Sequence, residues 1–470
     1  MRLTALKAFI LLFAVNSNAQ ALDFETAYKL MLENNGEYQA ALLNYKASKF
    51  DTKVAVSNYL PSVDLNGNYG RTNERIETRN QLSDDSTDAN NNSTGVDFDD
   101  EIVNEEGSFN SGSVSLDITQ PIFNKSLLSN IKRTKSLSKE AYYEWTELHE
   151  NLILRLLETY TNFLNATDEY LILSKELDAL EQHRQLTKKR HDQGLGNLTD
   201  LYESDARYEL AKAEQLSAEF NKDRFLFDLE VLTGIEIKNV QPLFTQFRPT
   251  VDSGLSSFDI ETVSDGEVLL AEQRVKTASH ELKQRKSAFA PILNLRAQST
   301  YSTSEFSDVS SDQDSQSERV FLELEIPLFA GFGNVAGVKG ARYRLSAQQA
   351  SLLDIKRGFN AEFETNRRNY QISYQRLKSF ERAYLANKKA LELREKAFIE
   401  GLSSNLDLLD SVRSAFLAER SWRESLYGFI NSKMALISSI KEINSSDIQG
   451  FNNYFKEQET TIVPDKVLSE

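Results

Sequence analysis

The spacing of the hydrophobic residues changes in the same order in each half of the chain. Residues 22–58 carry apolar side chains at helical intervals, and after them Val63 and Leu65 alternate with polar neighbours, as in a half-buried strand. The alternation resumes beyond a long stretch rich in Asn, Ser and acidic residues. We therefore expect a helix, followed by a β-hairpin over 61–121 whose tip is a polar loop over 71–112.

A much longer helical pattern follows the hairpin. Phe163, Tyr170 and Leu177 recur every seven residues, which is the spacing of a coiled-coil seam. An uninterrupted helix over 126–192 would be about 100 Å long at a rise of about 1.5 Å per residue. Such a helix is typical of a coiled coil or a tunnel wall rather than of a globular domain. The chain then reverses, which predicts a long helical hairpin over 124–234.

The second half repeats this order of elements, which indicates an internal duplication. It predicts a helix from residue 266, a β-hairpin over 291–327 and a second long helical hairpin over 331–443. The expected divisions are a signal peptide over 1–21, a first repeat over 22–234, an insertion over 235–265, a second repeat over 266–443 and a disordered tail over 444–470.

Each long helical hairpin turns at a glycine that is followed by two acidic residues at the same offsets. The matched sets are Gly194, Asp200 and Glu203 in the first hairpin and Gly401, Asp407 and Asp410 in the second. Acids three residues apart share one face of a helix. On this pattern alone, the favoured interpretation is that they stabilise a helix N-terminus, where negative charge offsets the helix dipole.

The four predicted strands each have one apolar and one polar side. No stretch after the first residues is long and apolar enough for a membrane-spanning helix, so any membrane-spanning part would be a closed β-barrel. Four strands cannot close alone, whereas three chains would supply twelve. The polar row would then line a water-filled lumen. Its members are Asp64, Asn66, Asp117, Arg296, Glu323 and Glu325.

Composition narrows the class of protein. The formal charge of −16 over 470 residues argues against a nucleic-acid partner, which would need clustered Lys and Arg. Arg2 and Lys7, the apolar run after them and an A-x-A site at 19–21 are typical of a secretory signal peptide. The chain has no cysteine, which excludes disulfides and a lipidated N-terminal Cys. These features indicate an exported protein of the bacterial envelope.

No arrangement of catalytic or metal-binding residues is evident. The four histidines, His149, His183, His191 and His280, lack metal-ligand spacing, so we expect surface or packing roles for them. A glycine-rich segment at 331–336 fits a strand-to-helix turn better than a dinucleotide fingerprint, since no buried βαβ unit surrounds it. We therefore expect no enzymatic activity, no cofactor and no metal.

Several short segments, together with the duplicated order of elements, carry a family resemblance. They are LDFETA at 22–27, QPIF at 120–123, LTG at 232–234 and IPLF at 326–329. In these the chain resembles the TolC-like outer membrane efflux proteins, over essentially the whole mature chain. The resemblance implies a mixed α/β-barrel membrane protein: a homotrimer whose protomers each give four strands to a twelve-stranded barrel, with antiparallel coiled-coil helices forming a periplasmic tunnel.

The resemblance also implies partners and a gate. The partners would be outer membrane lipid, a periplasmic adaptor protein and an inner-membrane pump or ABC exporter. In the family, a D-x-x-D pair after the glycine turn forms acidic rings at the narrow periplasmic end of the tunnel, and Asp407 and Asp410 match it. The family's reference member has Tyr and Arg where this chain has Phe398 and Ser403, so the gate would be held shut differently. Asp200 and Glu203 would lie on the other hairpin of the tip, where a capping role and a secondary role in the gate or in adaptor contact stay equally open.

Two functions of different classes stay open on the sequence. The first is a passive exit duct of a tripartite efflux or type I secretion system, in the outer membrane and extending into the periplasm. The alternative is a secreted or periplasmic coiled-coil scaffold, against which the paired amphipathic hairpins argue, since a fibre needs no lipid-facing band. The exported substrate, small molecule or protein, is not encoded in any segment of the chain.

Overall fold

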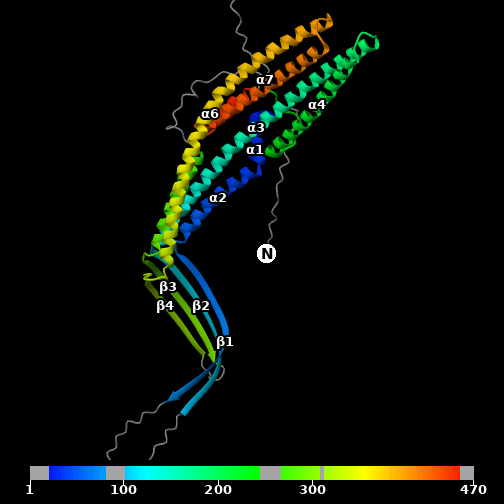
Figure 1. The fold of residues 1–470 in the computed structure, drawn as a ribbon. Helices are drawn as coiled ribbons and strands as arrows, with labels where there is room; N and C mark the ends of the chain where they lie inside the picture. Colours follow the sequence, from blue (N-terminus) through cyan, green and yellow to red (C-terminus); the bar gives the residue numbers. More distant parts are fainter. Residues whose placement is uncertain (1–20, 81–100, 244–265, 307–311, 456–470) are drawn as a thin grey trace, which may run out of the picture. The chain divides into compact units, whose positions relative to one another are not determined.

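A computed structural model describes residues 21–80, 101–243, 266–306 and 312–455 of the chain (Figure 1). The expected signal peptide, the centre of the first polar loop, most of the insertion and the end of the tail lie outside these residues. The chain forms two compact units. The helical unit comprises 1–47, 139–275 and 348–470, and the sheet unit comprises 48–138 and 276–347.

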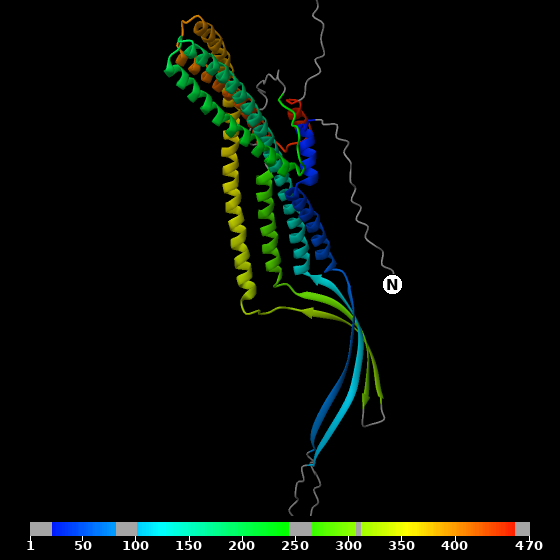
Figure 2. The same cartoon turned by 90° about the vertical axis from the view of Figure 1, so that its right-hand side faces the viewer.

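The sheet unit contains a four-stranded antiparallel sheet in the order β1-β2-β3-β4 (Figure 2). The strands are β1 (Ser62–Asn80), β2 (Glu101–Asn124), β3 (Ile292–Phe306) and β4 (Asp312–Glu325). Strands from the two halves of the chain meet at β2 and β3, where Asp117 lies opposite Gln298. The two predicted hairpins are therefore confirmed, and they join into one sheet.

The polar loop expected over 71–112 is wrong in its described parts, since 71–80 and 101–112 are strand. The β1–β2 ladder continues from Arg71 opposite Asn110 to Asn80 opposite Glu101. The reason is that an antiparallel ladder is built from backbone hydrogen bonds, which polar side chains do not prevent. In the second hairpin, expected over 291–327, β3 runs to Phe306 and β4 starts at Asp312.

Four helices contribute residues to both units. They are α2 (Gly36–Ser57), α3 (Lys125–Asp192), α5 (Gly266–Ser287) and α6 (Gly333–Ile399). Within the sheet unit their segments lie side by side in one layer (Figure 2). The α3 and α5 segments meet through polar contacts, with Ser129 Oγ 2.8 Å from Ser287 Oγ and Ser136 Oγ 3.1 Å from Thr277 Oγ1.

The helical unit adds α1 (Phe24–Asn34), α4 (Leu198–Thr233), α7 (Asn405–Ile440) and α8 (Ser445–Asn452). The seam residues predicted in α3, Phe163, Tyr170 and Leu177, are partly buried, and the residues three positions further on, Ala166, Leu173 and Leu180, are almost inaccessible. In the second hairpin, Tyr384 of α6 stacks on Trp422 of α7 with ring centroids 5.0 Å apart. Among the described residues, no helix combines the length and the apolar character that crossing a membrane requires.

The first predicted helix is divided in two at Asn35. Its N–H donates to Met31 O at the end of α1, and its side-chain oxygen accepts from the N–H of Tyr38 at the start of α2. One asparagine thus caps both helices. Nearby, Gly234 ends α4 in the left-handed conformation with φ 72°, as the sequence predicted. A Cβ there would lie 2.5 Å from Asn34 Cβ, so this contact requires glycine.

The tail expected to be disordered from residue 444 contains a helix. Asn444 and Asp447 form a reciprocal capping box at the start of α8. Ile448, Phe451 and Phe455 are buried at helical spacing in the main hydrophobic cluster of the helical unit. The described part of the tail, residues 444–455, is therefore ordered where a cap and three apolar positions coincide.

One carboxylic acid is buried in the helical unit. Glu176 of α3 is 5% exposed, and its Oε2 atom has no hydrogen-bond partner among the described residues. Burial raises the pKa of Glu176 to about 7, and the nearby Glu214 adds to this, while Arg420 and Arg413 oppose it. The folded protein therefore favours the protonated acid over a carboxylate.

We expect Glu176→Gln to stabilise the protein in alkaline solution only. Because the folded pKa lies above the unfolded one, the stabilisation due to protonated Glu176 is complete below about pH 4.5 and is lost as the pH rises through about 7. At pH 8 the variant should be more stable by roughly 2 kcal/mol, and near pH 5 it should match the parent chain. Thermal unfolding in detergent at both pH values measures this. Glu209→Gln, at an exposed position of α4, is the matched control; equal shifts in both variants would contradict the assignment.

Candidate functional site

The two glycine turns have the same backbone conformation. Gly194 and Gly401 have φ values of 72° and 76°, in the left-handed region that favours glycine. Gly194 N–H donates to His191 O, and the next N–H donates to Arg190 O, both at 2.8 Å. The second turn repeats this pattern, with Gly401 donating to Phe398 O at 3.1 Å. Both long helices therefore end in a Schellman motif. We call these two turns and the helix ends that they join the tip.

A capping residue starts the next helix three positions after each glycine. Asn197 caps α4 by accepting from the N–H of Thr199, and Ser404 caps α7 by accepting from the N–H of Asp407 at 3.1 Å. Asp407 is thus the third residue of its helix, where an acid offsets the helix dipole. The capping interpretation of Asp407 therefore has a structural basis, which does not exclude a second role for its exposed carboxylate.

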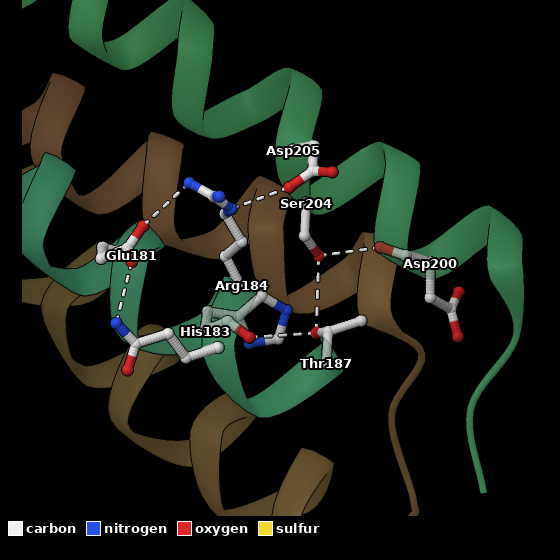
Figure 3. A network of polar contacts seen from close by, with 8 residues as sticks. Glu181, His183, Arg184, Thr187, Asp200, Ser204 and Asp205 are labelled. Atoms are coloured by element: carbon white, nitrogen blue, oxygen red, sulfur yellow. Dashed lines mark hydrogen bonds and ion pairs between the residues drawn. The ribbon is translucent and has the colours of Figure 1, made fainter. Parts of the chain in front are cut away.

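A buried polar network joins the two hairpins at the tip. His183 of α3 donates from Nε2 to Asn405 Oδ1 of α7 at 2.6 Å, and Asn405 Nδ2 donates to Asp200 O of α4 at 3.3 Å. Thr187 and Ser204 continue the network between α3 and α4 (Figure 3). Burial lowers the pKa of His183 below its usual range, although the hydrogen bond to Asn405 opposes this, so the ring is neutral at pH 7.

Phe398 lies inside the tip rather than on its surface. It is 7% exposed and belongs to a hydrophobic cluster whose members are Leu180, Ala211, Phe398, Leu408, Leu409 and Val412. Its ring meets His183 edge-on with centroids 5.2 Å apart, and the Arg190 guanidinium lies 5.3 Å from the ring centroid. Within one protomer, Phe398 of α6 therefore packs against α3, α4 and α7, and its ring is almost inaccessible to solvent.

The two acids of the second turn each lie beside an arginine. Asp410 Oδ1 is 2.8 Å from Nη2 of Arg207, which is on α4, so this pair links the two hairpins. Asp407 Oδ2 is 3.9 Å from Nη1 of Arg394. The Asp407 and Asp410 side chains nevertheless stay 54% and 57% exposed. Exposed pairs of this kind contribute only about 0–1 kcal/mol, so they orient the carboxylates more than they stabilise the fold.

The remaining predicted tip residues have different surroundings. Ser403 is partly buried, and its Oγ accepts from Arg394 Nη1 at 3.4 Å. Asp200 takes part in the network through its backbone carbonyl, while its carboxylate points away from the labelled side chains (Figure 3). Glu203 is partly buried on α4. The structure thus gathers Phe398, Ser403, Asp407 and Asp410 at one turn. Within the described part of the chain, the acids of the first turn, Asp200 and Glu203, form no matching ion pair with an arginine.

Three residues of the tip were not identified from the sequence. Arg394 lies seven residues before Gly401 and Asp407 lies six after it, so an antiparallel hairpin brings them to the same level. That symmetry was a usable signal. For Arg207 and Asn405 the sequence contained no such signal, because their partners, Asp410 and His183, belong to the other hairpin.

The sheet unit places the six predicted lumen residues on one face. Residues directly opposite in an antiparallel pair share a face, and the register pairs Asp64 with Asp117, Asp117 with Gln298, and Asn294 with Glu323. Asn66 Nδ2 donates to Asp117 Oδ2 at 3.1 Å, and Arg296 Nε lies 2.8 Å from Glu323 Oε2. The opposite face exposes large apolar side chains. They include Val63, Leu65, Tyr69, Val320, Leu322 and Leu324.

Comparison with known proteins agrees with this geometry. A family model described as outer membrane efflux protein matches residues 27–234 and 263–436, which are the two repeats without the insertion between them. The chain belongs to the outer membrane efflux protein family. This membership locates the chain in the outer membrane, and it confirms the family resemblance that the sequence carries.

Individual relatives are distant but extend over most of the chain. The alkaline protease secretion protein AprF of Pseudomonas aeruginosa is 24% identical over 447 residues, which cover 94% of this chain and 89% of AprF. The outer membrane protein TolC of Escherichia coli is 22% identical, over 73% of this chain and 72% of TolC. The CmeC outer membrane channel of Campylobacter jejuni superposes with a TM-score of 0.74 at 14% identity, covering 92% of this chain and 89% of CmeC. That likeness confirms the TolC-like fold.

We expect Asn405→Ala to open the tip locally. The substitution removes the acceptor of the buried His183 Nε2–H and the donor to Asp200 O, and an unpaired buried polar group costs about 1–3 kcal/mol. Amide hydrogen exchange around 183–190 and 405–410 should therefore quicken by about tenfold or more. Ser403→Ala, at the turn itself, is the control and should change exchange little. Unchanged protection in the Asn405 variant would show that the network does not hold the tip.

Proposed function

We propose that the chain is the exit duct of an export system that crosses both bacterial membranes, with three copies forming one channel. The observation that carries this proposal is the four-stranded sheet with a polar face and an exposed apolar face. Soluble proteins rarely expose so many large apolar side chains on one sheet face. Lipid on the apolar side and water on the polar side would account for both faces.

The edges of the sheet support assembly from several copies. Among the described residues, β1 pairs only with β2 and β4 pairs only with β3, so two strands have an unpaired edge. Within a bilayer, unpaired backbone groups are too costly to persist, and closure removes them. Three copies would give a twelve-stranded barrel, with Asp64, Asn66, Asp117, Arg296, Glu323 and Glu325 lining its lumen.

The tip would form the periplasmic gate. Asp407 and Asp410 are exposed on one helical turn of α7, and three copies of each around an axis would make a constriction that attracts cations. Phe398 supports the gate from within the protomer. Ser403 and Arg394 orient Asp407, while Arg207 ties Asp410 to the first hairpin. Asp200 and Glu203 would have a capping role or a secondary role at the gate.

The relatives support an inference about the partners and the cargo. A duct of this family performs no catalysis, so an inner-membrane pump or ABC exporter and a periplasmic adaptor would supply the energy and the connection. AprF, which matches nearly the whole chain, is named for protease secretion. This favours a protein cargo and a type I secretion system over the efflux of small molecules.

We expect purified full-length protein to be trimeric and to conduct ions in planar lipid bilayers. In Asp407→Ala/Asp410→Ala, block by a trivalent cation added on the tip side should weaken by about tenfold or more, because the acidic constriction is gone. Single-channel recording measures both properties. A monomeric protein without conductance would overturn the proposed duct.

A matched control separates the tip from the charge of the whole chain. Asp228→Ala/Asp354→Ala also removes two exposed aspartates from the helical unit, but away from the turns. Its block should equal that of the parent protein. If both double variants lose block equally, or neither does, Asp407 and Asp410 do not line the passage even though the channel conducts.

A further inference from the structure

The helical segments of the sheet unit are strongly basic in an acidic chain. Over 48–60, 125–138, 276–290 and 331–347 they carry 13 Lys and Arg residues and only two acids, although the chain as a whole has a net charge of −16. Asp51 and Glu281 are those two acids, and Glu281 already pairs with Arg344 at 2.9 Å. The positive charge of this region is therefore largely uncompensated within it.

Six of these cations form two stripes with the same spacing. Lys125, Lys132 and Lys135 lie on α3, and Lys276, Lys283 and Lys286 lie on α5, so each stripe follows the pattern i, i+7, i+10. This spacing keeps the three side chains of a stripe on one side of the helix. All six side chains are exposed. We call these six residues the lysine belt.

The two stripes lie on the same side of the α3–α5 pair. Contacts between Ser129 and Ser287 and between Ser136 and Thr277 bring Lys132 level with Lys283. Both lysines act on His280, whose pKa is lowered by burial first and then by the charges of Lys283 and Lys132. Because α3 and α5 run antiparallel and meet at these positions, the shared i, i+7, i+10 spacing puts both stripes on the same side of the contact. The Nδ1 atom of His280 has no hydrogen-bond partner among the described residues.

No carboxylate of the described residues lies within ion-pair distance of the lysine belt. Six like charges at this density repel one another and gain by an anionic partner. A single carboxylate or phosphate could contact only two or three of them, because each stripe extends over ten residues, or about 15 Å. The belt therefore fits an anionic surface rather than one small anion.

The belt begins where the sheet ends. Lys125 is the first residue after β2, and Lys286 lies six residues before β3. A rise of about 1.5 Å per residue puts Lys132 and Lys283 within about 15 Å of the strand ends. Phe123, Leu128 and Phe289, in the same segments, are exposed apolar residues. The chain thus passes from apolar strands to exposed aromatic residues and then to lysines. This order is the one expected along a membrane protein from the hydrocarbon core, through the interface, to the lipid headgroups.

We propose that the lysine belt binds the anionic phospholipid headgroups of the periplasmic leaflet. The assignment rests on the proposed function in one respect, that the apolar face of the sheet contacts lipid. The long lysine side chains reach toward the headgroups, and Leu128 and Phe289 lie against the acyl boundary. The attraction seats the protein at a fixed depth and falls with added salt, because exposed charges are screened within about 8–10 Å.

The test compares lipids bound to purified full-length protein in detergent micelles that contain equal amounts of phosphatidylglycerol and phosphatidylcholine. Native mass spectrometry counts each lipid on the protein. The parent protein should prefer phosphatidylglycerol. We expect this preference to fall by about tenfold or more in the triple variant Lys276→Gln/Lys283→Gln/Lys286→Gln. The reason is that each lysine near an anionic surface contributes about a fivefold gain in affinity. The corresponding triple Arg variant keeps the charge and should keep the preference.

The control is Lys188→Gln/Lys189→Gln/Lys212→Gln, which removes three exposed lysines of the helical unit and should leave the preference unchanged. Equal lipid preference in the parent and the α5 variant, or an equal loss in the control, would overturn the lipid site. So would altered ion selectivity of the α5 variant without altered lipid binding, which would place the lysines along the passage. Conductance in phosphatidylcholine bilayers tests the duct separately, since a parent protein that fails to conduct can still show the lipid preference.

Discussion

The helical unit depends on one buried tyrosine in the middle of its longest helix. The hydroxyl of Tyr160 lies 3.0 Å from the carbonyl oxygens of both Leu22 and Gln241, and its ring meets Phe24 and Phe455 edge-on. The start of the described chain, the described part of the insertion, α3 and the last described residue of the tail therefore converge on one fully buried side chain. Long helices gain most of their stability from such packing rather than from intrinsic propensity. This junction joins the segments that flank the two repeats to the longest helix, and the hydrogen bond from Asn452 Nδ2 to Asp23 Oδ2 adds to it.

The duplication preserves backbone geometry more closely than chemistry. Both tip turns use a left-handed glycine, the same pair of reversing hydrogen bonds and a cap three residues later. The side chains then diverge, because His191 stands where the second turn has the buried Phe398, and Asp407 has an arginine neighbour that Asp200 lacks. Turn geometry is fixed by local sterics, which every copy must satisfy. The identity of the side chains depends on the helix that packs against them, so the two halves could acquire different roles at the tip.

Local patterns in the sequence were sufficient for most of the fold. The change of period located all four strands, and the glycines and the heptads located both helical hairpins, because these signals depend on residues close in sequence. The extent of β1 and β2 was missed since backbone pairing tolerates the polar composition from Arg71 onward. The order in α8 was missed although Asn444 and Asp447 carry a capping signature. At the tip, the turn was predictable, but the Arg207–Asp410 and His183–Asn405 contacts join separate hairpins and leave no local trace.

Net charge is the wrong quantity for deciding whether this protein has an anionic partner. Screening limits the reach of an exposed charge to about 8–10 Å, so a surface responds to the charges on it and not to the sum over the chain. The value of −16 is a sum over acidic segments and a basic layer of helices next to the sheet. It argues against nucleic acid, whose binding would require an extended basic groove. The net charge also gives no sign of the six exposed lysines in two stripes on adjacent helices. Positive and negative charges can cancel in the sum over the chain and still lie on different parts of the surface.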